Sequence, residues 1–176
     1  MTENGKAAID FDGVNDYMVS NSAYPTQTTE THFYVASSTG TNNRVLDTRG
    51  TGGTGIVKGW HHKFSNIGLG DVSTIDDGAG AFILSQGIVR TGQKLVSVSF
   101  STTAITEYTN GVLSDNNSGS VTDFDSGNNL YIGANVNGAN LQLFNGTMQI
   151  IVLYNSNQSA NRTGIEGSIN EYYNIY

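Results

Sequence analysis

The stretch that decides the fold runs from residue 130 to residue 154 and reads LYIGANVNGANLQLFNGTMQIIVLY. Apolar residues alternate at positions 130, 132 and 134, and the even-numbered residues from 148 to 154 share one face of an extended segment. An Asn- and Gly-rich segment separates the two parts. The pattern predicts two strands joined by a turn-rich loop. Because neither strand can bury its apolar face alone, the rest of the chain is expected to cover it.

The composition of the whole chain indicates one all-β domain. The 176 residues include 22 glycines and 1 proline, with 37% hydrophobic and 13% charged residues. This length suits a single domain over residues 1–176 with a sizeable core. Short apolar runs broken by Gly and Asn clusters are typical of antiparallel strands.

The net charge of −7 argues against two classes of partner. No basic stripe is present, so we expect no nucleic acid binding, and an acidic surface repels anionic membranes. No apolar run approaches the roughly 18 residues of a membrane span. The first six residues lack the apolar core of a signal peptide. We therefore expect a protein used without Sec-type export, or a virion component released by lysis.

Alternation and turn signals predict the remaining strands. The clearest covers residues 94–101, where two valines and Phe100 face inward and three serines face outward. Asn110-Gly111, between strands at 104–109 and 112–113, predicts a type I′ hairpin turn. Residues 20–30, 68–80 and 115–129 are expected to be loops, and residues 1–6 a flexible or docking end. Further strands are expected at residues 7–11, 17–19, 31–37, 44–48, 56–60, 63–67 and 82–89.

The C-terminal tail changes period. Apolar residues at 165, 169 and 172 or 173 lie at helical spacing, which predicts a short helix near residues 160–171. Ser159 or Asn161 is the expected N-cap, and an extended end follows the helix. Ile151 and Leu153 lie on the odd-numbered face of the last strand, and we expect the tail to cover that face. The chain then forms two packed antiparallel sheets.

Several stretches, in the right order along the chain, resemble motifs of laminin-G-like domains of the concanavalin A-like lectin-glucanase superfamily. Residues 11–17 (FDGVNDY) are similar to the opening FDG-x-x-DY motif, and residues 107–112 (EYTNGV) to a strand and turn ending in NG. Residues 130–134 and 144–154 resemble the late IG and F-x-G motifs. The resemblance implies an all-β, two-sheet antiparallel jelly-roll sandwich with a short C-terminal helix. It implies no single function, because this fold hosts lectins, glycan-binding modules, glycosidases and structural domains.

Catalysis has little support in the sequence. Glycosidases of this superfamily carry closely spaced carboxylates on one strand, and retaining hydrolysis needs two carboxyl groups about 5 Å apart. The chain has five glutamates, and none has another acidic residue at that spacing. Asp123 and Asp125 form the nearest pair, and their Ser/Gly/Asn-rich surroundings favour a solvated loop. We predict a non-enzymatic protein.

Calcium is the one ion for which the sequence offers candidate ligands, and no cofactor is predicted to be required. Relatives of this class often hold Ca²⁺ near loop ends, and calcium takes six to eight oxygen ligands. Asp71, Asp76 and Asp77 lie in a segment expected to be irregular, with free carbonyl groups. The alternative, a solvated acidic loop, carries more weight. Residues 10–16 look superficially like a calcium loop, and the resemblance implies a structural turn there.

Four residues are candidates for contact with a ligand. Trp60, His61 or Tyr108 would stack a sugar ring at the rim of a sheet, because aromatic faces suit glycan recognition. Asn137 lies in a variable loop that is a second candidate contact. The alternative for Trp60, a core position, is the commoner one for a single tryptophan.

Two functional hypotheses follow. The first is a non-catalytic binding or adhesion module on a virion, such as a bacteriophage capsid decoration, fibre or spike protein, that recognises cell-surface glycan. The second is a purely structural virion protein held by other virion proteins or, in a homo-oligomer, by copies of itself. The expected location is a virion surface, or alternatively the cell surface or extracellular space. A rim pocket with one aromatic and two or more polar residues would favour the first hypothesis.

Overall fold

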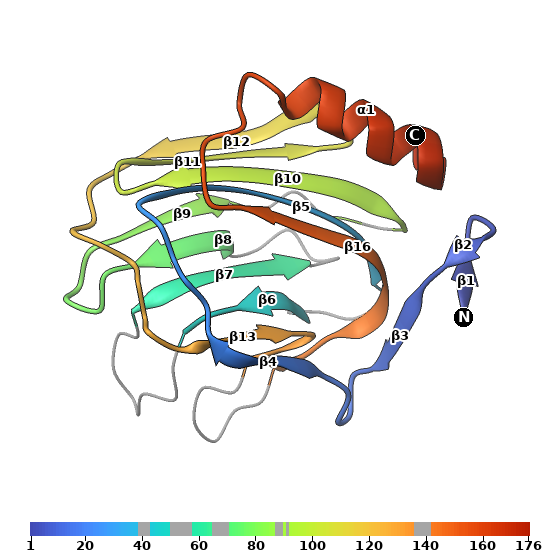
Figure 1. Ribbon diagram of the computed structural model, residues 1–176, viewed down its shortest axis with the longest axis horizontal. Coiled ribbons are helices and arrows are strands. Elements are labelled where there is room, and N and C mark those ends of the chain that lie inside the picture. The colour runs from blue at the N-terminus through green and yellow to red at the C-terminus, as the bar shows by residue number, and fades with distance from the viewer. Residues whose placement is uncertain (39–42, 50–57, 65–70, 87–89, 91, 136–141) are drawn as a thin grey trace.

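The computed structural model describes residues 1–38, 43–49, 58–64, 71–86, 90, 92–135 and 142–176, apart from the side chains of residues 43, 71, 72 and 86. Within these residues, two six-stranded antiparallel sheets pack face to face, and a helix lies outside the first sheet (Figure 1). The predicted all-β sandwich with a short C-terminal helix is therefore confirmed.

The first sheet, called sheet I, carries the helix. Its strands, in spatial order, are β12 (Val112–Ser118), β11 (Ala104–Thr109), β10 (Lys94–Ser101), β5 (Thr29–Ser38), β16 (Asn145–Tyr154) and β3 (Ile9–Asp12). The ten-residue strands β5 and β16 form its centre, and β10 pairs with β5 along its whole length.

The second sheet, called sheet II, is also a six-stranded antiparallel sheet. Its strands, in spatial order, are β4 (Met18–Ala23), β13 (Asn129–Ile132), β6 (Asn43–Asp47), β7 (Gly59–Phe64), β8 (Asp71–Asp76) and β9 (Phe82–Gln86). The remaining elements are the pairs β1 (Thr2–Glu3) with β2 (Lys6–Ala7) and β14 (Ala134–Asn135) with β15 (Gln142–Leu143), and the helix α1 (Arg162–Tyr173). No helix in the described part of the chain is long and apolar enough to cross a membrane.

The period-2 alternation of β5 divides the apolar side chains between two clusters. Tyr34 and Ala36 point into the main core between the sheets, whereas Phe33 and Val35 point outward beneath α1. Ile169 of the helix completes the outer cluster. One strand therefore supports both the sandwich and the helix that covers it.

Two glycine positions explain motifs in the sequence. Asn110 and Gly111 both have positive φ, 51° and 76°, as the predicted type I′ turn requires. Gly133 has a φ of 81°, and a β-carbon there would lie 2.5 Å from the ring of Phe11. Phe11 of β3 and Gly133 of the late IG motif thus meet in the core, where only glycine leaves room for the ring.

The helix covers the last strand on the opposite face from the one predicted, so that prediction is wrong. The pairing of β16 with β5 shifts between Met148 and Ile150, so Gln149 is an extra residue in the ladder. A one-residue bulge moves every later side chain to the other face. Ile151 and Leu153 consequently pack toward the main core, and α1 covers the opposite face of the strand. That covered face carries Ile150, Val152 and Tyr154.

Several element boundaries also differ from those expected. Residues 59–64 form one strand, β7, in place of two strands meeting at a histidine pair, and β8 lies in the segment 68–80 expected to be a loop. Strands β4 and β12 extend through residues 20–23 and 115–118, which were also expected to be loops. Residues 1–7 form a hairpin fixed by Asn4, whose side-chain amide donates to the carbonyl of Asn174. The helix continues to Tyr173, leaving a shorter tail than predicted.

Candidate functional site

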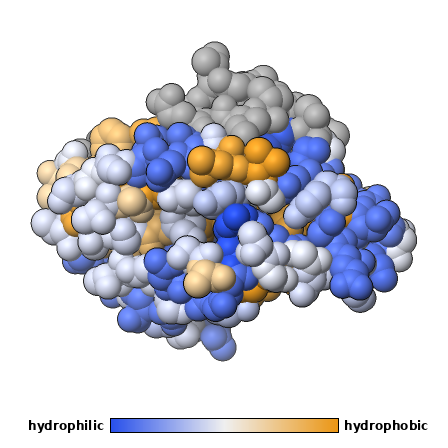
Figure 2. All heavy atoms as spheres, turned by 90° about the horizontal axis from the view of Figure 1, so that it is seen from above, coloured by the Kyte–Doolittle hydropathy of each residue, from blue (hydrophilic) through white to orange (hydrophobic). Residues whose placement is uncertain are grey.

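A groove of about 290 Å³ lies on the outer face of sheet I, beside the first turn of α1. Its floor comes from β10 and β11 and its wall from the loop that leads into the helix. The side of the molecule that carries α1 in Figure 1 is largely hydrophilic when seen from above, with separate hydrophobic patches (Figure 2). The groove is lined by Thr29, Ser99, Phe100, Ser101, Ala104, Thr106, Tyr108, Asn157, Ser159 and Arg162.

The polar floor follows from strand alternation. Apolar residues of β10 point into the main core, so the serines between them point outward, and Ser99 and Ser101 reach the groove. On β11, Thr106 and Tyr108 do the same while Ile105 is buried in the core. The sheet therefore presents hydroxyl groups to solvent without weakening its buried face.

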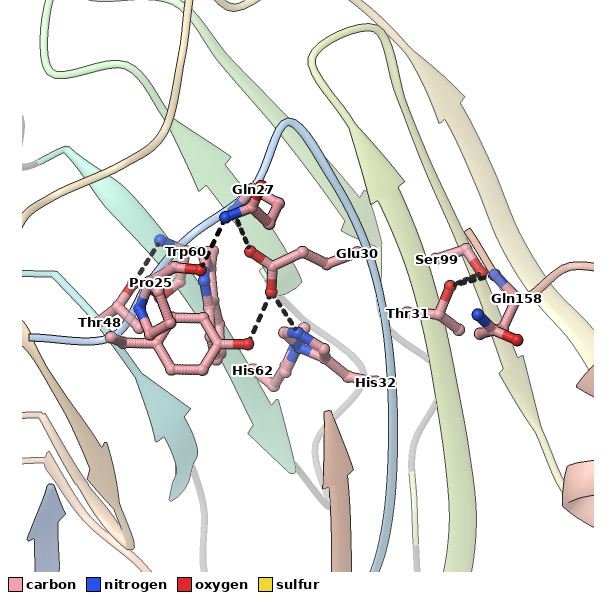
Figure 3. A network of polar contacts seen from close by, with 11 residues as sticks. Pro25, Gln27, Glu30, Thr31, His32, Thr48, Trp60, His62, Ser99 and Gln158 are labelled. Carbon is pink, nitrogen blue, oxygen red and sulfur yellow. Dashed lines mark hydrogen bonds and ion pairs between the residues drawn. The ribbon is translucent and has the colours of Figure 1, made fainter. Parts of the chain in front are cut away.

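The wall of the groove is held by hydrogen bonds to the sheet. The backbone N–H of Gln158 donates to Oγ1 of Thr31 at 2.9 Å, and that hydroxyl lies 3.3 Å from Oγ of Ser99 (Figure 3). These contacts anchor the connection between β16 and α1 to the middle of sheet I. Asn157 and Ser159, on either side of Gln158, are thereby positioned along the groove.

The charged end of the groove consists of three side chains from two elements. The guanidinium carbon of Arg162 lies 3.6 Å from the centre of the Tyr108 ring. Nη1 of Arg162 also forms an ion pair with the carboxylate of Glu166, one helical turn further on. Glu166 is only 2% exposed, and its second oxygen accepts a hydrogen bond from Ser97. Arg162 is thus fixed over the aromatic ring by a buried partner.

Of the residues proposed from the sequence to contact a ligand, Tyr108 lies in the groove. Asn137 lies outside the described residues. The prediction for Trp60 and His61 is wrong, because both side chains are fully buried, with 0% exposure. Trp60 instead packs within the main core, where its ring centre is 4.5 Å from that of His32.

Sequence reasoning did not identify Arg162, Asn157 and Ser159 as ligand contacts. Arg162 lay within the predicted helix, Ser159 was considered only as its N-cap, and Asn157 preceded it. The outward serines of residues 94–101 were a usable signal, because a strand with hydroxyls on its exposed face is open to a polar ligand. No pattern in the sequence showed that the segment after residue 154 turns back over that face.

A second polar assembly lies between the sheets, and it contains the other histidines. Oε2 of Glu30 lies 2.7 Å from Nε2 of His32, and Nδ1 of His32 lies 2.9 Å from Nε2 of His62 (Figure 3). Nδ1 of His62 lies 2.9 Å from Oγ of Ser73, which donates to Glu107 at 2.7 Å. The guanidinium of Arg90 forms an ion pair with Glu107. We call this assembly the buried polar chain; its members are Glu30, His32, His62, Ser73, Glu107 and Arg90.

The hydrogen bonds determine where the protons of this chain lie. Ser73 gives its only hydroxyl proton to Glu107, so it must accept from Nδ1–H of His62. Neutral His62 then accepts at Nε2 from Nδ1–H of His32. The remaining nitrogen of neutral His32 has no proton, and we infer that it accepts one from the carboxyl of Glu30.

The electrostatics of the buried polar chain agree with this assignment. Burial raises the pKa of Glu30 to about 7 and lowers the pKa of His32 to about 3. Burial also lowers the pKa of His62 well below its usual value. Both histidines are therefore neutral near pH 7. His32 on sheet I contacts His62 on sheet II, and Ser73 on sheet II donates to Glu107 on sheet I, so the assembly ties the two sheets together.

The acidic residues proposed as calcium ligands make hydrogen bonds to the backbone. The carboxylate of Asp76 accepts from the N–H of Gly78 at 2.8 Å, and the carboxylate of Asp77 accepts from the N–H of Ala79 at 2.8 Å. The side chain of Asp71 lies outside the described set. The described residues contain no group of three or more His, Cys, Asp or Glu side chains placed to share a metal ion. A calcium site stays a prediction.

No protein-family model matches this sequence, and no curated protein matches it. Solved structures are similar in fold. The carbohydrate-binding module CBM40 of the Ruminococcus gnavus IT-sialidase, bound to α2,3-sialyllactose, has a TM-score of 0.62 at 14% identity, covering 89% of this chain and 94% of that chain. Domain 4 of the arabinanase AbnA from Geobacillus stearothermophilus, in complex with arabinotriose, has a TM-score of 0.60 at 13% identity, covering 84% and 69%.

Domains LG4-5 of the mouse laminin α1 chain have a TM-score of 0.60 at 16% identity, covering 82% of this chain and 40% of that chain. A pentraxin from Limulus polyphemus has a TM-score of 0.62 at 12% identity, covering 92% and 82%. At these identities the likeness concerns the fold. The chain has the concanavalin A-like jelly-roll fold that the laminin-G-like motifs implied.

Proposed function

We propose that this protein is a non-catalytic glycan-binding module whose ligand lies in the groove between sheet I and α1. The observation that carries the proposal is the groove itself. Tyr108 supplies an aromatic ring, and serine and threonine hydroxyls, the amide of Asn157 and the guanidinium of Arg162 supply hydrogen-bonding groups. Small-molecule sites combine an apolar surface with a few converging polar groups in this way.

The chemistry of the groove suits a polyhydroxylated ligand. Hydroxyl and amide groups both donate and accept, so they can match sugar hydroxyls in either sense. Asn157 and Ser159 are held in position by the anchored backbone of Gln158. This lowers the conformational entropy that is lost when a ligand binds. The groove has the lining expected from the sequence, an aromatic with several polar residues, and it lies on the outer face of sheet I instead of at a rim.

A binding role without catalysis is supported by the lining of the groove. Glycoside hydrolysis by the usual route needs two carboxyl groups on either side of the scissile bond. Among the described residues that line the groove, none is Asp or Glu. Glu166, the nearest carboxylate named above, is buried and paired with Arg162.

The similar structures support the same class of ligand. The Ruminococcus module is bound to α2,3-sialyllactose, and the Geobacillus domain is in complex with arabinotriose. A botulinum neurotoxin binding domain solved with SialylT, with a TM-score of 0.59 at 11% identity, is a third case. The virion location, the homo-oligomer and the alternative of a purely structural protein stay predictions.

A glycan array tests this proposal. Wild-type protein is expected to bind a restricted set of glycans, and Ala104→Trp is expected to abolish the signal because the indole fills the groove from its floor. Ala79→Trp, at an exposed loop position, is the matched control and should bind like the wild type. No binding by folded wild-type protein, or equal binding by Ala104→Trp, would overturn the proposal.

A further inference from the structure

We propose that the groove selects sugars that carry a carboxylate, with the guanidinium of Arg162 as the group that recognises it. This inference rests on the proposed function, because it names the ligand class of the same site.

Arg162 is the only charged residue among the described side chains that line the groove. The chain as a whole carries 15 acidic residues against 8 basic ones, so a positive lining without acidic neighbours is unusual for its surface. Glu166, the carboxylate paired with Arg162, is buried. A ligand carboxylate therefore meets a cation in the groove and, among the described lining residues, no acidic side chain.

One face of the Tyr108 ring is not available for stacking against a sugar. The guanidinium lies 3.6 Å from the centre of the Tyr108 ring and occupies one of its faces. An uncharged pyranose would use such a face for contact with its C–H groups. In this groove that position presents a charged hydrogen-bond donor, which favours an anionic group of the sugar over a plain ring.

Arg162 keeps a pair of donors for such a group. Nη1 is engaged by Glu166, whereas Nε and Nη2 have no hydrogen-bond partner among the described residues. These two nitrogens form one side of the planar guanidinium, and that geometry matches the two oxygens of a carboxylate. Ser97 holds Glu166 and Glu166 holds Arg162, so the donor pair is oriented before a ligand arrives.

The size of the groove limits the ligand to a short unit. A volume of about 290 Å³ is near the lower end of ligand pockets, which start at about 300 Å³. The groove therefore suits one terminal acidic sugar with its carboxylate at Arg162. Asn157 and Ser159, in the loop that forms the wall before Arg162, are placed to contact its hydroxyl groups.

Titration with matched acidic and neutral probes tests the inference. The probes are α2,3-sialyllactose and digalacturonic acid, each compared with its own carboxyl methyl ester. We expect at least one acid to bind about tenfold or more tightly than its ester, the size of a charge-assisted hydrogen-bond pair. Arg162→Lys keeps the charge and the partner of Glu166 but removes the planar donor pair, and it should reduce this preference by a similar factor.

Arg49→Lys is the matched control, because Arg49 is also 15% exposed and also paired with a carboxylate, that of Asp47. It should bind like the wild type. Acids that bind no better than their esters, on a protein that binds neutral glycans on the array, would overturn the inference and leave the proposed function standing. Failure to bind any glycan would overturn both. Equal binding by wild type and Arg162→Lys would overturn the assignment to Arg162.

Discussion

The groove on sheet I and the buried polar chain between the sheets contain similar residue types and differ in how those residues are partnered. In the buried polar chain, successive side chains from Glu30 to Arg90 hydrogen-bond or pair with one another. In the groove, Tyr108 and Arg162 are held in place and the hydroxyl of Thr106 donates to Asn116, whereas Nε and Nη2 of Arg162 have no hydrogen-bond partner among the described residues. Polar side chains that satisfy one another stabilise a fold, and those left available can bind a ligand.

The comparison explains why Trp60 is a core residue and Tyr108 lines the groove, although both were proposed from the sequence as ligand contacts. Trp60 lies on β7, between the sheets, beside His32 and His62 of the buried polar chain. Tyr108 lies on the outer face of β11. Position relative to the core, and not aromatic character, separates the two.

The largest expected difference follows from truncating the two aromatic residues. Trp60→Ala removes a fully buried indole, and we expect it to lower the free energy of unfolding by about 3–5 kcal/mol. Tyr108→Ala removes a half-buried ring and should lower it far less while weakening glycan binding. Urea denaturation and array binding of both variants measure this contrast. Similar stability loss in both variants would contradict the assignment of Trp60 to the core.

Removing one end of the buried polar chain should also be severe. Arg90 is 0% exposed, and Arg90→Met leaves Glu107 buried without its cation. We expect a loss of about 3–5 kcal/mol in the free energy of unfolding. Lys58→Met is the control, because its ion pair with Asp123 joins side chains that are 34% and 50% exposed and is expected to contribute at most about 1 kcal/mol. Equal losses from the two substitutions, measured by urea denaturation, would show that the Arg90 pair is not a structural contact.

The buried histidines predict how stability depends on pH. A group whose pKa is depressed in the folded state stabilises above its unfolded pKa, so neutral His62 favours folding above about pH 6.5. Neutral His32, with a pKa of about 3, likewise makes the folded state more stable as the pH rises. Glu30, with its pKa raised to about 7, makes the folded state less stable as the pH rises. Between about pH 4.5 and 6.5 these last two effects offset each other, and His62 remains.

We therefore expect the free energy of unfolding to rise from pH 4.5 to 6.5, because the lowered pKa of His62 makes the unfolded state bind the proton more readily than the folded state. It should then level off near pH 7. Thermal and urea denaturation across this range measure the slope. His62→Gln should reduce the slope, and an unchanged slope in that variant would mean that another group is responsible.

The smallest expected effect concerns the anchor of the groove wall. Thr31→Val keeps the shape of a fully buried side chain but removes the hydroxyl that accepts from Gln158. One lost hydrogen bond is expected to lower the free energy of unfolding by about 1 kcal/mol. Glycan affinity should fall as well, because Asn157 and Ser159 lose their fixed position. Thr122→Val, at an exposed loop site, is the control; a weaker effect at Thr31 than at Thr122 would contradict the anchoring role.

The sequence alone was enough for the sandwich and for most strands. Alternation is a local property, and the strands at residues 94–101 and 104–109 have the predicted bounds. The bulge at Gln149 was not visible, because it depends on how β16 pairs with β5. That single extra residue reversed the prediction of which face the helix covers.

The candidate site was less accessible to sequence reasoning because its parts are distant in the chain. Tyr108 and Arg162 are brought together by the packing of α1 on Phe33 and Val35, and no short motif joins them. Trp60 and His61 were attractive because aromatic and imidazole groups are common in binding sites. Their burial depends on the neighbouring strands of sheet II, which a local pattern does not reveal.

The most direct test of the central claim is a map of backbone amide chemical shifts during titration with the best-bound glycan of the array. The groove predicts that the largest changes occur at Ser99, Thr106 and Arg162. The buried polar chain should show only small changes, at His62 for example. Largest changes at Gln27 and Asp125, which line a different pocket, with none around Arg162, would contradict the claim that the groove is the binding site.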